Sequence, residues 1–362
     1  MKDERAHLQL FDLIAREWHL PAPAHQVLFN GNDSAVAFAC ADGSIHLAAT
    51  ADKASPNVRT RRAVDTGRVT IAPRDKPANP LKVSDYTDGR STALALHGRT
   101  NFIFGKATGR INTLTPGGIA VHLPLRAAGP VSVVATGPDG ETLACACDTL
   151  VSFDGAEMQH DAPVSAMAFS PDGRTLAVTH GATVTRWTVE ATPVSVQSDL
   201  PAPAIDLVWS ADGQTLAILL QNNGFCALTT ETGLITHRGN FPAQVRAVGF
   251  SPATQTVVAA GAFRVAGWTL ADGQNVVTGK SGLTLIDSIA TCPTRNLVAV
   301  GYANGLLSLA EIGRPSEILL REDTGASICA MAWSANGKFL ALAGADGSAA
   351  LVEFPDTMFK PT

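Results

Sequence analysis

The chain has 362 residues, of which 46% are hydrophobic and 16% charged, and its formal net charge is −5. No apolar run reaches the ~18 residues that a membrane helix needs, and the charged start, residues 1–5, lacks the apolar core of a signal peptide. These features predict a cytoplasmic protein with no membrane partner, and the low charge fits stacked sheets that are buried on both faces.

The N-terminal segment, residues 1–24, has two interpretations. It carries four apolar residues on one helical face, which predicts a short helix: Leu10, Leu13, Ile14 and Trp18. The stretch Arg16–Leu20, just before Pro21, is also a candidate for a strand that pairs with the far end of the chain. The two interpretations are compatible if a helix runs directly into a strand.

The first repeat unit has an apolar run ending at Phe29, a second run over 35–39, an Asp42-Gly43 turn and a third run over 45–48. Alternation with period 2 is typical of strands. An Asp-Gly pair supplies the positive φ that a tight reversal needs.

A basic segment separates this unit from the next one, which is centred on Leu96. Residues 59–82 hold seven basic and two acidic groups, and three prolines lie among them, which predicts a long insertion over 63–90. Its basic side chains are candidate contacts for an acidic protein partner, and the alternative is a solvated loop. Nucleic acid is disfavoured, because the segment has no aromatic residue and the rest of the chain is acidic. The candidate contacts are Arg59, Arg61, Arg62, Arg68, Arg74 and Lys76.

Further along, one phrase recurs about every 40 residues: Val164-Ser-Ala-Met-Ala-Phe-Ser-Pro-Asp-Gly173 returns as Ala204–Gly213, Val245–Pro252 and Ile328–Gly337. A period near 40 with four short strands per unit is the pattern of propeller blades. Eight positions hold the last residue before the first turn of a unit: Phe29, Leu96, Thr136, Phe169, Trp209, Phe250, Thr291 and Trp333.

The sequence therefore predicts an all-β chain with a single β-propeller of four-stranded antiparallel blades over 25–355, followed by a tail over 356–362. Eight blades are favoured over the commoner seven. The last unit stops after three strands, at Glu353-Phe354. Because pairing with the opposite terminus removes a free sheet edge, we expect Arg16–Leu20 to supply the missing strand.

No enzymatic motif accompanies the repeat, since the sequence has no G-x-S-x-G elbow, P-loop or dinucleotide fingerprint. The nine histidines form no i, i+4 pair and are expected at the surface or at strand ends, and the six cysteines form no C-x-x-C pair. We therefore predict no catalytic residue, no metal site and no cofactor. The alternative is a small-ligand or enzymatic site at the mouth of the central channel.

With this repeat, the chain resembles WD40-repeat proteins over essentially its whole length. The resemblance rests on the recurring phrase and on Gly344–Ser348. The Trp-Asp dipeptide of that family is replaced by pairs such as Trp187-Thr188, although Asp42 and Asp346 keep the Asp position of its buried Asp-His-Ser-Trp network. That network cannot be carried over, so apolar packing must contribute more here.

A narrower resemblance is to bacterial WD40-like proteins, whose C-terminal part is similar to Ala299–Gly305, Glu317–Arg321 and Ala330–Ser334. Such proteins are often encoded near metal-chaperone GTPases of the cobalamin-synthesis type. The resemblance implies a non-catalytic scaffold that binds protein partners through loops of a propeller face. It also implies a link to metal homeostasis by gene neighbourhood, and no ligand residue transfers with it.

Overall fold

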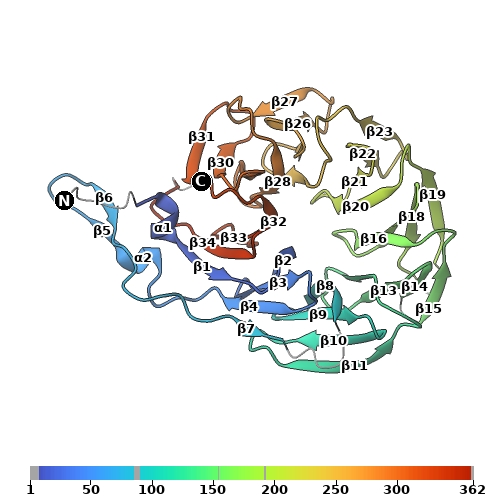
Figure 1. Cartoon of the computed structure of the whole chain (residues 1–362). Coiled ribbons are helices and arrows are strands. Elements are labelled where there is room, and N and C mark those ends of the chain that lie inside the picture. The colour runs from blue at the N-terminus through green and yellow to red at the C-terminus, as the bar shows by residue number, and fades with distance from the viewer. Residues whose placement is uncertain (1–7, 85–89, 154, 191–192, 360–362) are drawn as a thin grey trace.

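The computed structural model describes residues 8–84, 90–153, 155–190 and 193–359. Within these ranges, eight four-stranded antiparallel sheets follow one another around a ring (Figure 1). The prediction of an all-β propeller, with eight blades rather than seven, is confirmed. The first strand of each blade lies nearest the centre of the ring, and the later strands lie progressively outward (Figure 1).

The strands of the first four blades are β2 (Ala24–Phe29), β3 (Ala35–Cys40), β4 (Ile45–Ala49) and β7 (Lys82–Val83); β8 (Ser91–His97), β9 (Asn101–Lys106), β10 (Arg110–Leu114) and β11 (Ala120–Arg126); β12 (Val133–Thr136), β13 (Leu143–Cys147), β14 (Leu150–Phe153) and β15 (Ala156–Gln159); and β16 (Val164–Phe169), β17 (Thr175–His180), β18 (Thr183–Thr188) and β19 (Ser195–Asp199).

The strands of the last four blades are β20 (Ala204–Trp209), β21 (Thr215–Leu220), β22 (Gly224–Thr229) and β23 (Ile235–Arg238); β24 (Val248–Ser251), β25 (Thr256–Ala259), β26 (Val265–Thr269) and β27 (Asn275–Thr278); β28 (Ile286–Thr291), β29 (Leu297–Tyr302), β30 (Leu307–Glu311) and β31 (Glu317–Arg321); and β32 (Ile328–Trp333), β33 (Phe339–Gly344), β34 (Ser348–Glu353) and β1 (Ala15–His19). The elements outside the blades are α1 (Leu10–Ile14), α2 (Pro56–Arg59), β5 (Thr60–Arg62) and β6 (Val69–Ile71).

The N-terminal segment completes blade 8. Helix α1 runs directly into β1, which pairs antiparallel with β34 from Ala15 opposite Val352 to His19 opposite Ser348. The ring-closing prediction is thus confirmed, and the helical and extended interpretations both hold, with Trp18 on the strand. Phe11 of α1 is fully buried in a cluster with side chains of blades 7 and 8. The segment therefore closes the ring through both backbone pairing and apolar packing.

The recurring turn between the first and second strands of a blade is held by its own side chains. In blade 4, Asp172 Oδ1 accepts hydrogen bonds from Ser170 Oγ at 2.6 Å and from the amide of Arg174 at 3.0 Å. In blade 5, Asp212 Oδ1 accepts from Ser210 Oγ at 2.6 Å and from a backbone amide in the same way. These hydrogen bonds lower the pKa of both carboxyl groups. The two aspartates are therefore ionised at neutral pH.

Two tryptophans, each the last residue of the first strand of its blade, form hydrogen bonds to the preceding blade. Trp209 of blade 5 donates Nε1–H to the carbonyl of Ala168 in blade 4 at 3.1 Å, and Trp333 of blade 8 donates to Ala290 in blade 7 at 2.9 Å. The hydrogen bonds repeat because the same repeat position faces the preceding blade each time. Most buried side chains between blades are aliphatic or aromatic, as expected for sheets packed face to face.

Candidate functional site

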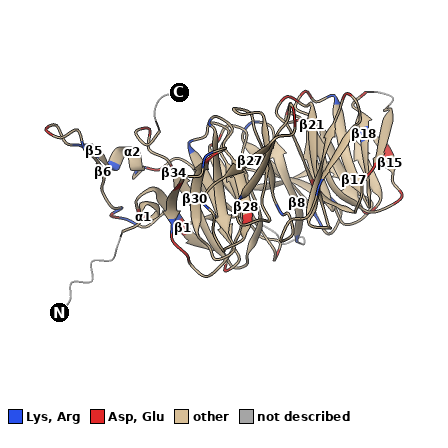
Figure 2. Ribbon diagram, turned by 90° about the horizontal axis from the view of Figure 1, so that it is seen from above, with Lys and Arg blue, Asp and Glu red and all other residues tan. Residues whose placement is uncertain are grey.

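The segment between β4 and β7 leaves the ring of blades and returns to it. It carries α2 and a hairpin of β5 and β6, which projects outward beyond blades 1 and 8 (Figures 1 and 2). We call residues 60–71 the arginine hairpin and the chain on either side of it the stem. A two-stranded hairpin is marginally stable in water by itself, so its position depends on the contacts of the stem.

Arg59 fixes the base of the hairpin. Its guanidinium donates from Nε to the carbonyl of Ala54 at 2.8 Å, from Nη2 to the carbonyl of Leu13 at 2.6 Å, and from Nη1 to the carbonyl of Ala72. These three acceptors lie on the incoming stem, on α1 and on the outgoing stem. One side chain therefore joins both sides of the hairpin to the N-terminal helix.

Asp52 is the centre of a second set of stem contacts. It forms an ion pair with Arg74, and Oδ2 lies 3.9 Å from Nε of Arg16. Arg16 on β1 is only 6% exposed and donates to the carbonyls of Ala49 at 2.9 Å and Thr50 at 2.8 Å. Burial alone would raise the pKa of Asp52, but the hydrogen bond from Arg74 and the charge of Arg16 lower it below its usual range.

Two further side chains connect the stem to blade 8. Trp18 on β1 donates Nε1–H to the carbonyl of Asn79 at 2.7 Å. Ser55, the N-cap of α2, donates to Glu353 Oε1 on β34 at 2.5 Å. Burial raises the pKa of Glu353, which the hydrogen bond from Ser55 opposes. The blade that closes the ring therefore also holds both sides of the stem, the incoming side at Ser55 and the outgoing side at Asn79.

The six basic residues predicted as partner contacts divide into two groups. Arg59 and Arg74 are partly buried, and their guanidiniums are taken up by the protein's own carbonyls and by Asp52. The other four are exposed: Arg61, Arg62 and Arg68 on the arginine hairpin, and Lys76 on the outgoing stem. The structure brings the three hairpin arginines together on one projecting element.

The arginine hairpin also exposes apolar side chains. Val64 at its turn is fully exposed and Val69 on β6 is 42% exposed. The turn is closed by hydrogen bonds from the amide of Ala63 to the carbonyl of Arg68 at 2.9 Å and from the amide of Gly67 to the carbonyl of Ala63 at 2.9 Å. Gly67 has φ +66°, a conformation that glycine adopts without strain. The arginine hairpin therefore presents both arginine and valine side chains on one protruding element.

Sequence reasoning treated this segment as a loop and missed the hairpin. The signal was present in Asp65-Thr66-Gly67, a turn sequence followed by the strand-forming residues Val69–Ile71. Strands of three residues have too few positions to show period-2 alternation.

A cavity of about 320 Å³ lies at the turns that follow the first strands of blades 1 to 4, the region of the alternative channel-mouth site. Its lining includes Arg99 and Asp139. The carboxylate of Asp139 accepts hydrogen bonds from the amides of Glu141 and Thr142 and from the hydroxyl of Thr142, all within its own turn. This polar group therefore stabilises the turn, and we assign no chemistry to the cavity.

Buried histidines form a structural cluster between blades 3 and 4. The rings of His160 and His180 are 4.4 Å apart, and His180 Nδ1 lies 2.7 Å from Asp161 Oδ1. Burial, assisted by the neighbouring His180, lowers the pKa of His160 to about 4. In the part of the chain that the structure describes, no group of three or more His, Cys, Asp or Glu side chains could hold a metal ion.

Two family models match parts of the chain. The model of the anaphase-promoting complex subunit 4 WD40 domain matches residues 289–358, and the model of the WD domain, G-beta repeat, matches residues 156–187. Comparison with curated proteins gives no significant match. The crystal structure of the computationally designed Ika8 protein is similar over 96% of this chain and 100% of that one, with a TM-score of 0.69 and 17% sequence identity. That likeness concerns the fold alone.

Neither α1 nor α2, the helices of the described residues, has the length and hydrophobicity of a membrane span. The repeat-model matches fall on blades 3–4 and 7–8, and each matched range contains one copy of the recurring phrase, Val164–Gly173 or Ile328–Gly337. Together with the ring of eight four-stranded blades, they identify the chain as a β-propeller with WD40-type repeats and support its assignment to the WD40-repeat family.

Proposed function

We propose that this propeller is a non-catalytic cytoplasmic scaffold that binds an acidic protein partner through the arginine hairpin. The observation that carries the proposal is that the basic residues of this segment fall into two groups, one used in internal contacts and one exposed. Arg59 and Arg74 hold the stem, whereas Arg61, Arg62 and Arg68 are exposed on an element that takes no part in closing the ring.

The chemistry of the hairpin favours protein over other partners. Arginine is enriched at protein interfaces because its planar guanidinium binds carboxylates bidentately and also packs on apolar and aromatic surfaces. The exposed Val64 and Val69 add apolar contact area beside those charges. The resemblance also implies a link to metal homeostasis, and in this proposal the bound partner would be the protein that acts there. The propeller itself is assigned no metal site.

The test is affinity capture with quantitative mass spectrometry. The wild type is compared with the variant Arg61→Glu/Arg62→Glu/Arg68→Glu, which leaves Arg59 and Arg74 in the stem. The matched control reverses three other exposed arginines on blades 2, 6 and 7, Arg126, Arg246 and Arg314, and changes the net charge by the same amount. A protein retained by the wild type and the control but lost by the hairpin variant supports the proposal. Identical captured proteins for all three would overturn it.

A further inference from the structure

A groove of about 720 Å³ lies between blades 4 and 5. It is formed by the first turns of both blades, by β18 and the outer strand β19 of blade 4, and by the turn over 230–233 of blade 5. Its chemistry is mixed, with carboxylate, indole and aliphatic groups lining one continuous space. Its charged and apolar lining includes Asp172, Asp212, Glu231, Trp187, Trp209 and Val196.

The charge of the groove is predominantly negative. Asp172, Asp212 and Glu231 are all exposed. Each aspartate uses Oδ1 for its own turn, and among the described residues no hydrogen bond reaches Oδ2 of either one. Arg186 also lines the groove, but Nη1 donates to the carbonyl of Thr230 at 2.8 Å. Carboxylate oxygens thus remain available to the guanidinium of an incoming chain.

The apolar part of the groove suits arginine and valine side chains. Trp187 and Trp209 are both partly exposed there, and an indole face attracts a guanidinium through its quadrupole. Val194 and Val196 beside them are 59% and 53% exposed. Val196 lies on β19, the outer strand of blade 4 and a free sheet edge among the described strands.

From these features we propose that the arginine hairpin of one molecule binds the groove between blades 4 and 5 of a second molecule, so that the protein associates head to tail. The inference rests on the proposed function, because it takes the hairpin as the docking element and identifies its acidic partner as another copy of this chain. Three exposed arginines meet three exposed carboxylates, and the valines of the hairpin meet Val194 and Val196.

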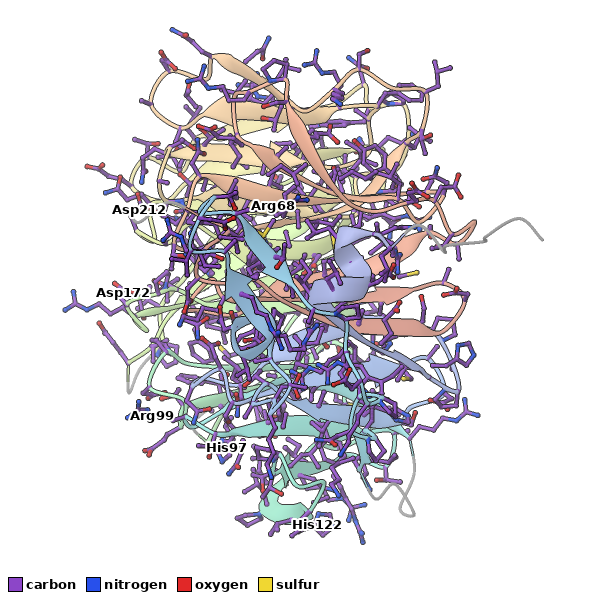
Figure 3. All side chains as sticks on the ribbon, turned by 90° about the vertical axis from the view of Figure 1, so that its left-hand side faces the viewer. Arg68, His97, Arg99, His122, Asp172 and Asp212 are labelled. Atoms are coloured by element: carbon purple, nitrogen blue, oxygen red, sulfur yellow. The ribbon has the colours of Figure 1, made fainter. Side chains whose placement is uncertain are left out.

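The position of the two surfaces decides between internal and intermolecular contact. The hairpin projects from the side of the ring formed by blades 1 and 8, and blades 4 and 5 lie on the opposite side (Figure 1). Figure 3, which views the ring from the hairpin side, shows Asp172 and Asp212 along one face of the ring and Arg68 on the hairpin in front of it. A rigid ring cannot bring these surfaces together within one molecule. Two different patches that meet in this way form a heterologous interface, which propagates unless it closes into a ring.

The test uses sedimentation velocity of the full chain from low micromolar to high micromolar concentration. The hairpin variant is R61E/R62E/R68E. The groove variant is D172N/D212N/E231Q, in which each asparagine keeps the acceptor oxygen that the turn uses. We expect the wild-type sedimentation coefficient to rise with concentration, less so at high salt, and each variant to associate at least tenfold more weakly. Mixing the two variants restores one intact hairpin and one intact groove, so we expect a 1:1 dimer that grows no further.

Three results would overturn the inference: a wild type that is monomeric at every concentration, variants that associate as strongly as the wild type, or a mixture of variants that stays monomeric. Failure here is distinguishable from failure of the proposed function. A monomeric wild type whose hairpin variant still loses a foreign acidic protein in the capture experiment contradicts the head-to-tail contact and leaves the scaffold proposal intact.

Discussion

Replacing Arg59 by Met should release the arginine hairpin from the ring without unfolding the blades. Arg59 donates three hydrogen bonds to backbone carbonyls, of Ala54, Leu13 and Ala72. A methionine keeps much of the aliphatic length of the side chain and removes all three donors. The exposed residue Arg61, two positions along the chain, has no such contacts in the described structure and provides the matched control, Arg61→Met.

The magnitude follows from the number of hydrogen bonds and their exposure. A hydrogen bond contributes about 1 kcal/mol net, and more where the donor is charged. The stem is only partly buried, so water can hydrogen-bond to the three carbonyls in the variant and offset part of the loss. The free energy of local opening should therefore fall by about 2 kcal/mol. Because about 1.4 kcal/mol corresponds to a factor of ten, the open state of the hairpin becomes about 30-fold more populated.

Native-state hydrogen exchange measures this opening directly. The informative amides are those of Ala63 and Ala72, which donate to carbonyls across the hairpin at 2.9 Å and 3.1 Å. Their protection should fall about 30-fold in Arg59→Met, whereas amides of the central blade strands keep theirs. Protection in the hairpin that changes less than about threefold, or falls equally in Arg61→Met, would refute the assignment of Arg59 to the stem.

Three further outcomes are expected. Arg16→Met should lower the free energy of unfolding by about 2 kcal/mol in urea titrations, because the buried carbonyl of Thr50 and the part-buried carbonyl of Ala49 lose a charged donor. Trp333→Phe should cost about 1 kcal/mol in the same assay, because the carbonyl of Ala290 loses its partner. The pKa of His160 is about 4 in the folded chain against 6.5 for an ordinary histidine, so unfolding takes up a proton at a pH between these two values. The contribution of His160 to the free energy of unfolding is therefore complete above pH 6.5 and decreases as the pH falls toward 4. Screening by solvent reduces the effect to about 1–2 kcal/mol between pH 7 and pH 5; His160→Gln should abolish it, and replacement of the exposed His237 by Gln should not.

The blades could be predicted from sequence because their determinants are local and repeated. Phe169 and Trp209 stand at the same place before an Asp-Gly turn, and alternation with period 2 fixes which side chains face the neighbouring blade. Ring closure was predictable for a related reason, since blade 8 lacked a strand and Arg16–Leu20 was the unassigned segment at the other terminus.

The candidate site was predictable only in part. The charge excess located the segment, but Arg59 and Arg61 are the same residue type two positions apart, and only the fold separates their roles. The acceptor of Arg59 on Leu13 is 46 residues away in sequence, and it is a backbone carbonyl, which any residue type provides. No sequence pattern marks such a contact. The contact between the tilted rings of His160 and His180 likewise arises where two blades meet.

The ring-closing strand has a second consequence for function. Arg16 and Trp18 are two positions apart on β1, so they point to the same side of the strand. Both donate to the segment between β4 and β7, Arg16 at Thr50 and Trp18 at Asn79. Strand β1 therefore both pairs with β34 and holds the stem in place. Loss of β1 would free the stem even if the remaining blades held together, because it also removes these donors. A hairpin fixed in this way meets a partner with little further ordering, and the lower entropic cost favours binding by so small an element.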